Sequence, residues 1–271
     1  MDMGKAVREA TDEAISPPPD AVNPFVRHPL RRYAFGWRQL AGRTGRHLDL
    51  GCGQGEFLLT LHRTTALTCL GADPHAGYLA GIRRDCPGLP LQRAAVAGSL
   101  GFAEAAFDSV SLLDVLEHAP DAGRLLAEVH RILVPGGLLV LSVPRRHLFS
   151  FLDPDNAKFR LPRLHRLVYQ ARFGRQVYRE RFLDLSNGLI GDMSVGKHEH
   201  TNYRTPDLME LLAAHGFEPL TVTSANLFWR WLQVPALLLG GPLRRLLERL
   251  IYLDGVVFKS ANLFVTARSA P

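Results

Sequence analysis

The feature that most constrains the fold of this 271-residue chain is a glycine-rich loop between a short apolar segment and a helical one. A strand is predicted at residues 46–50 and a helix at 56–63, with Gly51, Gly53 and Gly55 between them. Glycine permits positive φ angles and lets a ligand approach the backbone without meeting a Cβ atom. A strand, such a loop and a helix in this order are typical of nucleotide-binding α/β sheets, so the sequence predicts a binding site at the end of this strand.

Short apolar segments and helical segments alternate along most of the remaining chain. Another helix is predicted to begin with Thr205 as its N-cap and Pro206 at its first position. This alternation favours a doubly wound, Rossmann-like α/β fold whose seven strands form a parallel sheet with helices on both faces. Besides those above, strands are predicted at residues 67–72, 91–96, 108–113, 138–143, 217–224 and 261–267, and helices at 30–41, 75–84 and 122–133.

Two stretches interrupt the alternation. Residues 145–200 contain no clean strand and are predicted to form a basic lid insertion, and residues 227–258 are predicted to form a helical insertion before the last strand. Long insertions in a regular fold usually carry function. The predicted division is therefore a disordered tail at 1–24, a cofactor-binding core at 25–144, the lid, and a completion of the core at 201–271.

Positive charge is concentrated around the predicted lid. The chain has a net charge of +6, whereas residues 144–181 alone contain ten Lys or Arg residues against three acidic ones. A basic patch of this kind attracts nucleic acid, an anionic membrane surface or an acidic substrate, and a solvated arginine-rich helix face is the alternative. Because no recognisable RNA-binding module accompanies the patch, we expect no nucleic-acid partner.

Cysteine spacing and hydropathy bear on the compartment in which the protein is expected. The cysteines indicate a reducing one. Cys52, Cys69 and Cys86 lack the spacing of a zinc site or a disulfide framework, so free thiols and no metal site are predicted. The N-terminus has no apolar run that resembles a signal peptide, and the most apolar stretch, residues 227–241, is too short to span a bilayer. These features favour a cytoplasmic protein, with peripheral contact at the inner membrane face as an open alternative.

Three acidic residues narrow the ligand that is expected at the glycine loop. Asp49 lies in the strand before the loop, and Asp73 ends the next strand, where a carboxylate can accept hydrogen bonds from two ribose hydroxyls. The spacing GxGxG differs from the GxGxxG of dinucleotide-binding folds, and Glu56 at the start of the helix would repel a pyrophosphate. The pattern therefore favours a sulfonium nucleoside over NAD.

Five segments, taken in order, resemble the successive motifs of class I S-adenosylmethionine-dependent methyltransferases. They are residues 47–61, 71–73, 107–110, 113–118 and 133–137, and a looser resemblance covers 198–224. The most similar subgroup comprises small-molecule methyltransferases, which include ubiquinone-biosynthesis O-methyltransferases and enzymes that modify polysaccharides and natural products. The resemblance implies S-adenosylmethionine as the cofactor.

The resemblance also implies a role for each matching residue. Asp73 would bind the ribose, Asp49 would lie near the cofactor's amino group, and Asp114 would face the methionine moiety and the substrate. The family often reads adenine with an acidic residue after the third strand, but none is present here, so backbone and apolar contacts from Val96 and Ala97 are expected instead. The full set of expected cofactor-binding residues is Asp49, Gly51, Cys52, Gly53, Gly55, Asp73, Pro74, His75, Val96, Ala97 and Asp114, with Pro74 and His75 beside the adenosine.

Two histidines are candidates for the acceptor side of the site. His198 and His200 come shortly before the helix predicted at Thr205. This segment resembles those that border the acceptor pocket in related enzymes. Methyl transfer depends on alignment of the nucleophile, and an alcohol or phenol benefits from a base such as histidine. Both are therefore candidate catalytic bases; a structural role stays open, and a metal site lacks an obvious third ligand. His118 and Glu117 are interpreted as residues that fix a loop.

The helical insertion leaves several roles open. Residues 227–253 combine aromatic, aliphatic and arginine residues, and 243–253 has helical periodicity. This composition is typical of an interfacial helix that lies on a membrane. Packing on its own domain, closure over the pocket and a homodimer seam are the alternatives.

The predicted function is methyl transfer from S-adenosylmethionine to a hydroxyl of a small-molecule or lipid-linked acceptor, such as a sugar or a natural product. The alternatives are an N-methyltransferase that acts on a small-molecule amine, a tRNA methyltransferase that uses the basic lid, and a cofactor-binding partner protein without activity. The preference for an oxygen acceptor depends on the lid histidines and on family analogy.

Overall fold

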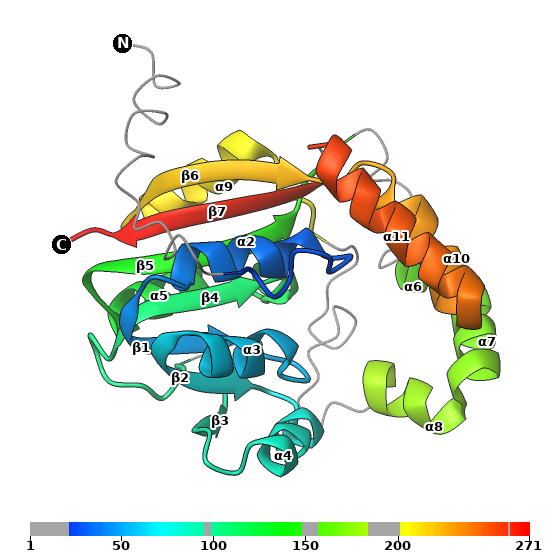
Figure 1. The fold of residues 1–271 in the computed structure, drawn as a ribbon, viewed down its shortest axis with the longest axis horizontal. Helices are drawn as coiled ribbons and strands as arrows, with labels where there is room; N and C mark the ends of the chain where they lie inside the picture. Colours follow the sequence, from blue (N-terminus) through cyan, green and yellow to red (C-terminus); the bar gives the residue numbers. More distant parts are fainter. Residues whose placement is uncertain (1–21, 95–98, 148–156, 184–200, 260) are drawn as a thin grey trace.

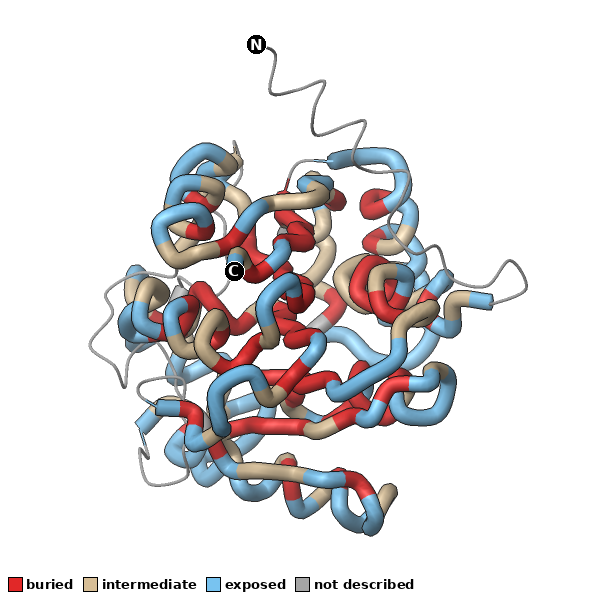
Figure 2. The backbone as a smooth tube through the Cα atoms, turned by 90° about the vertical axis from the view of Figure 1, so that its left-hand side faces the viewer, coloured by how far each residue is buried: buried red, intermediate tan, exposed pale blue. Residues whose placement is uncertain are grey.

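The computed structural model describes residues 22–94, 99–147, 157–183, 201–259 and 261–271 (Figure 1). Within them, seven strands form one sheet in the order β3-β2-β1-β4-β5-β7-β6, and the buried residues run through its centre (Figure 2). The strands are β1 (Thr44–Leu50), β2 (Ala66–Asp73), β3 (Leu91–Arg93), β4 (Phe107–Leu113), β5 (Leu133–Pro144), β6 (Phe217–Ala225) and β7 (Asn262–Ser269). The helices around the sheet are α2 (Arg31–Leu40), α3 (Glu56–Thr64), α4 (Ala76–Asp85), α5 (Ala122–Ile132) and α9 (Thr205–Ala214). The predicted seven-stranded α/β fold is confirmed.

Strand direction differs from the prediction at β7. Strands β1 to β5 pair in parallel, whereas β7 lies antiparallel between β5 and β6. The prediction of a wholly parallel sheet is therefore wrong. Hydrophobic periodicity indicates which side chains face the core, but the same alternation occurs in either direction along a strand.

Two element boundaries also differ from the prediction. Arg204 is the N-cap of α9 and makes no side-chain capping bond, so the assignment of Thr205 as N-cap is wrong. β5 begins at Leu133 and not at residue 138, because Leu133 pairs with Phe107 before the ladder shifts register. The irregularity accommodates the Pro-Gly-Gly sequence of residues 135–137 inside the strand.

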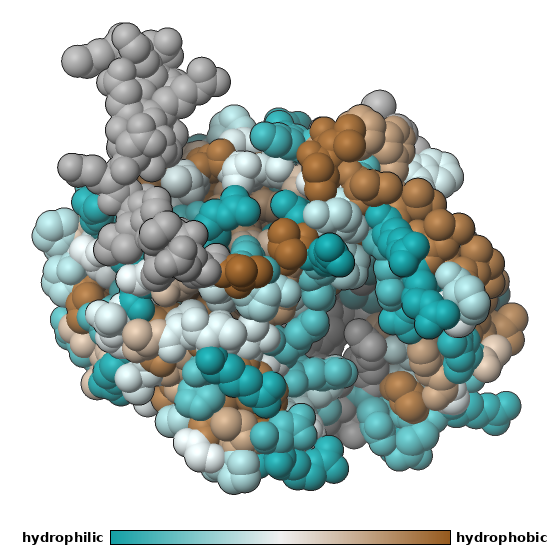
Figure 3. All heavy atoms as spheres, in the orientation of Figure 1, coloured by the Kyte–Doolittle hydropathy of each residue, from teal (hydrophilic) through white to brown (hydrophobic). Residues whose placement is uncertain are grey.

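Two groups of helices extend beyond the carboxyl ends of the parallel strands (Figure 1). One group follows β5 and comprises α6 (Ala157–Arg160), α7 (Pro162–Phe173), α8 (Arg175–Tyr178) and the π-helix Arg179–Leu183. The other connects β6 to β7 and comprises α10 (Trp229–Leu238) and α11 (Gly241–Val257), which pack against each other. Hydrophobic surface gathers along α10 and α11 (Figure 3). Among the described residues, no helix has the length and apolarity needed to cross a membrane.

A buried carboxylate holds the base of this second group. Asp254 of α11 accepts hydrogen bonds from the backbone N–H groups of Leu227 and Phe228, both at 2.9 Å, where α10 begins. Asn226, which follows β6, has a φ of +66°, and its carbonyl oxygen accepts a hydrogen bond of 2.6 Å from the Ala261 N–H. The two ends of the helical pair therefore meet at one point beside the sheet.

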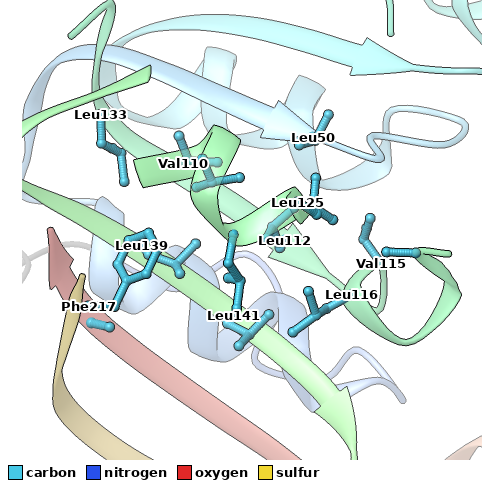
Figure 4. Close-up of a cluster of buried hydrophobic side chains, with 14 of the residues drawn as sticks. Leu50, Val110, Leu112, Val115, Leu116, Leu125, Leu133, Leu139, Leu141 and Phe217 are labelled. Atoms are coloured by element: carbon cyan, nitrogen blue, oxygen red, sulfur yellow. The ribbon is translucent and has the colours of Figure 1, made fainter. Parts of the chain in front are cut away.

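The core consists of two apolar layers, one on each face of the sheet. One layer joins Leu112 and Leu139 of the sheet to Leu125 of α5 (Figure 4) and to α9. The other layer joins the sheet to α2, α3 and α4 and contains Trp37 and Phe57. Each large apolar side chain buried in this way contributes about 1.5–3 kcal/mol. This doubly covered sheet fixes the strand ends on which the candidate site is built.

Candidate functional site

The glycine loop connects the carboxyl end of β1 to α3. Gly51, Gly53 and Gly55 have φ angles of +80°, +53° and +84°. A Cβ atom at Gly51 would lie 2.3 Å from Val115 Cγ2, and one at Gly55 would lie 2.7 Å from Ile82 Cγ1. A Cβ atom at Gly53 would meet nothing within 4 Å. Packing therefore requires the first and third glycines, whereas Gly53 borders open space.

Asp73 at the end of β2 is bonded to this loop. Its Oδ2 accepts a hydrogen bond of 2.8 Å from the Gly53 N–H, and its Oδ1 accepts one of 2.8 Å from the His75 N–H. Burial raises the pKa of Asp73, and these two hydrogen bonds oppose the increase. The Gly51 N–H donates to the Ala72 carbonyl at 2.8 Å. The end of β2 therefore holds the loop through both a side chain and the backbone.

Asp49 lies buried in β1 at the end of a chain of hydrogen bonds. Ser111 Oγ donates to Asp49 Oδ1 at 2.6 Å, and the His47 ring lies 3.1 Å from Ser111 Oγ through Nε2 and 2.9 Å from Ser109 Oγ through Nδ1. Because the Ser111 proton is given to Asp49, Ser111 accepts from His47 Nε2–H, and Nδ1 accepts from Ser109. Burial lowers the pKa of His47 to about 3 and raises the pKa of Asp49 to about 7. The histidine is therefore neutral, and the carboxyl group titrates near neutral pH.

Asp114 follows β4 and pairs with an arginine that no sequence motif marks. Its backbone has a φ of +58°, and its Oδ1 accepts a hydrogen bond of 2.5 Å from Ser142 Oγ. Arg32 of α2 donates from Nη1 to Asp114 Oδ2, and its guanidinium carbon lies 4.8 Å from the centre of the Tyr33 ring. Asp114 precedes Val115, which packs against Gly51. The ion pair therefore lies next to the glycine loop, and only the folded chain brings Arg32 there.

Three carboxylates thus mark the ends of three adjacent strands: Asp73 on β2, Asp49 on β1 and Asp114 after β4. Together with the open space at Gly53, this edge suits a ligand that carries positive charge and hydroxyl groups. Across the described part of the chain, no group of three or more His, Cys, Asp or Glu residues is placed to hold a metal ion.

Comparison with known proteins agrees with this geometry. Residues 48–141 match the family model of a methyltransferase domain. The chain is 34% identical over 149 residues to a ubiquinone biosynthesis O-methyltransferase of Azorhizobium caulinodans, a match that covers 49% of this chain and 56% of the relative. The chain contains a class I S-adenosylmethionine-dependent methyltransferase domain.

Other proteins share parts of this methyltransferase domain. The ubiquinone biosynthesis O-methyltransferase of Ruegeria pomeroyi is 28% identical over 197 residues, with coverage of 69% of this chain and 66% of the relative. A solved S-adenosylmethionine-dependent methyltransferase from Mesorhizobium loti has the same fold, with a TM-score of 0.51 at 23% identity and coverage of 83% and 91% of the two chains. The matches to the first curated relatives span about half to two-thirds of those proteins.

The methyltransferase domain implies S-adenosylmethionine as its cofactor, which the name of a relative 32% identical over 123 residues also states. Its sulfonium and ammonium groups are positive, its ribose has two hydroxyls, and its methionine carboxylate is negative. The three carboxylates fit the positive groups and the ribose hydroxyls, and the Arg32 guanidinium fits the methionine carboxylate. The residues present therefore fit the cofactor.

The remaining described residues of the expected set are fixed by other contacts. The Cys52 side chain is buried, and burial raises the pKa of its thiol far above the usual range, so only its backbone is available to a ligand. His75 is the N-cap of α4 and accepts from the Tyr78 N–H at 3.2 Å through Nδ1. The Pro74 carbonyl accepts a hydrogen bond of 3.0 Å from Arg93 Nε. These bonds hold the turn after β2 in one conformation.

Four predicted site residues, Val96, Ala97, His198 and His200, lie outside the described residues. Their roles stay predictions. The described chain resumes at residue 201, and the Tyr203 N–H donates to the Pro144 carbonyl at 2.9 Å. The segment that follows the two histidines therefore returns to the carboxyl end of β5.

Proposed function

We propose that this protein transfers the methyl group of S-adenosylmethionine to a hydroxyl oxygen of a small-molecule or lipid-linked acceptor, such as a sugar or a natural product. The row of carboxylates at the ends of β2, β1 and β4, beside the open space at Gly53, is the observation that carries the proposal. The choice of an oxygen acceptor is supported by the names of the relatives, which describe O-methyl transfer in ubiquinone biosynthesis.

The donor side uses the charged residues around the glycine loop. A carboxylate offers about four acceptor positions, and Asp73 uses two of them on Gly53 and His75, which leaves two for the ribose hydroxyls. Asp49 would attract the cofactor's ammonium group. Arg32, held in place by Asp114, would bind the methionine carboxylate. The adenosine would be flanked by Pro74 and His75 and contacted by Val96 and Ala97, as the sequence predicts.

The acceptor side would use the segment that contains His198 and His200. One of these histidines would accept the proton of the acceptor hydroxyl, and S-adenosylmethionine would supply the methyl group that passes from its sulfur to the hydroxyl oxygen. S-adenosylhomocysteine is the second product. Alignment of the oxygen with the carbon–sulfur bond supplies most of the acceleration in such a displacement. This chemistry requires no metal ion.

Calorimetric titration with S-adenosylhomocysteine tests the donor side. Asp73→Ala removes two charge-assisted hydrogen bonds to the ribose, so the dissociation constant should rise by about 100-fold. Asp85→Ala, which removes an exposed carboxylate from α4, is the matched control and should bind normally. Unchanged affinity in a folded Asp73→Ala variant would show that the ribose assignment is wrong.

Release of S-adenosylhomocysteine with a panel of alcohol, phenol and amine acceptors tests the acceptor side. We expect release with an alcohol or phenol, and a marked loss of rate in the His198→Gln, His200→Gln double variant. Turnover of an amine that survives both substitutions would favour an N-methyltransferase. Cofactor binding without turnover of any acceptor would favour a non-catalytic partner protein.

A further inference from the structure

One side of α11 is an apolar stripe that no described part of the chain covers. Its members follow each other at intervals of three and four residues, which places them on one face of the helix. They are between 39% and 65% exposed: Leu243, Leu246, Leu250, Leu253 and Val257. Ile251, Asp254 and Gly255, near the end of the helix, are buried along the flank next to the stripe. The helix is therefore anchored along this flank and leaves the stripe in solvent.

The stripe belongs to a larger apolar surface. Trp231 and Leu238 of α10, Leu239 directly after it, and Phe258 after α11 are also exposed. Figure 3 shows hydrophobic residues along the whole length of these helices. Exposed apolar surface on this scale marks a site where another molecule binds, and tryptophan is enriched where proteins meet the membrane interface.

The charges beside the stripe indicate what binds there. Arg245 and Arg249 are exposed, and neither has an acidic partner among the described residues, whereas Arg244 pairs with Glu248 at 2.8 Å. Residues 157–183, at the same end of the molecule, contain eight basic residues and one acidic residue (Figure 1). Within that segment, three of these eight basic residues, Arg166, Arg175 and Arg179, line a cavity of about 520 Å³. This end of the protein therefore presents positive charge next to apolar surface.

We propose that α11 docks the protein onto an anionic phospholipid membrane, with the apolar stripe in the interface and Arg245 and Arg249 against the lipid headgroups. An amphipathic helix with arginines beside its apolar face binds such a surface in two ways. Its apolar side chains are buried in the interface, and its arginines are attracted to the anionic headgroups. A second copy of this chain is a poorer partner. If the apolar stripes of two copies packed together, Arg245 and Arg249 of both copies would come close and their positive charges would repel. The carboxyl ends of the parallel strands face the same end of the molecule, so docking would place the candidate site near the bilayer (Figure 1).

Sedimentation with vesicles tests this proposal. We expect the full chain to bind vesicles that contain phosphatidylglycerol, to bind phosphatidylcholine vesicles much more weakly, and to dissociate as salt is raised. Leu246→Gln with Leu250→Gln should lower vesicle binding by about 10-fold for each leucine. Val222→Gln, an exposed apolar residue on β6, is the matched control and should bind as the unmodified protein does.

A charge variant tests the second half of the proposal. Arg245→Gln with Arg249→Gln should weaken binding to anionic vesicles by about 30-fold, because each arginine near the surface contributes about fivefold. Arg63→Gln with Arg84→Gln removes the same charge from exposed positions on α3 and α4 and should have little effect.

Equal binding to both kinds of vesicle would overturn the role of the arginines. A lipid-free dimer that the leucine variant dissociates, with no vesicle binding, would overturn the membrane as the partner. Cofactor affinity is measured on every variant and should not change, so failure here is distinct from failure of the proposed function.

Discussion

The buried Asp49 makes the pH dependence of cofactor binding a strict test of the proposed donor site. Burial raises the pKa of this carboxyl group to about 7, so roughly half of the unliganded molecules carry its proton at pH 7. An ammonium group placed beside Asp49 would favour the ionised form. Binding should therefore release about half a proton at pH 7 and about 0.9 of a proton at pH 6. His47, whose pKa burial lowers to about 3, stays neutral throughout this range.

Calorimetry of S-adenosylhomocysteine binding in two buffers with different ionisation enthalpies measures this proton release. The dissociation constant should also rise by about tenfold for each pH unit below the pKa. Asp49→Asn keeps an oxygen that can accept from Ser111, so the fold is preserved while the pH dependence disappears. Equal proton release in the two proteins, or none in either, would refute the placement of the ammonium group beside Asp49.

The same raised pKa has a consequence for stability. Because the folded value lies above the unfolded one, the contribution of Asp49 to stability is present below about pH 4 and is lost as the pH rises through about 7. Asp49→Asn should therefore gain stability relative to the unmodified protein as the pH rises from 4 to 8, by a few kcal/mol at most, on the order expected for a buried carboxylate. Thermal unfolding across this range measures the difference.

Two further predictions concern stability. Gly51→Ala places a Cβ atom 2.3 Å from Val115 at a φ of +80°, so it should destabilise the protein by about 1–3 kcal/mol in chemical denaturation, whereas Gly53→Ala, which meets no atom within 4 Å, should cost less and act mainly on cofactor affinity. Equal losses of stability would contradict the different roles assigned to the two glycines. Asp254→Ala leaves two N–H groups at the start of α10 without their acceptor and should lower the free energy of unfolding by about 1–3 kcal/mol for each, measured in the same way. An unchanged midpoint would show that this carboxylate does not hold the helices.

The parts of the structure that follow from local chemistry could be predicted from the sequence. The glycine loop was recognisable because only glycine tolerates its φ angles and close packing, and the strands because their apolar residues recur at the period of a buried sheet. The carboxylates at the ends of β1 and β2 could be placed for the same reason: a strand followed by a turn fixes where its last side chain lies.

The parts that depend on contacts between distant segments could not be predicted. Arg32 reaches Asp114 across 82 residues of sequence, and the helix that carries it has no distinguishing pattern. The direction of β7 depends on the path of the connection from β6, which apolar alternation does not encode. The start of β5 at Leu133, ahead of the Pro-Gly-Gly sequence, could not be predicted because a bulge that absorbs this sequence can be recognised only from the neighbouring strand.

The hydrogen bond between Asn226 and Ala261 closes the helical pair α10–α11 into a unit with a narrow neck. The β6–β7 ladder begins at this neck with Ala225 and Asn262 and owes none of its pairing to the helices beyond it. The register of the sheet is therefore set by the strands themselves and not by the length of α10 and α11. The unit also touches α2, where Tyr252 and Gly255 pack against Arg31, the neighbour of the arginine that pairs with Asp114. A change at the surface of α11 thus has a short path of contacts to the site that binds the methyl donor.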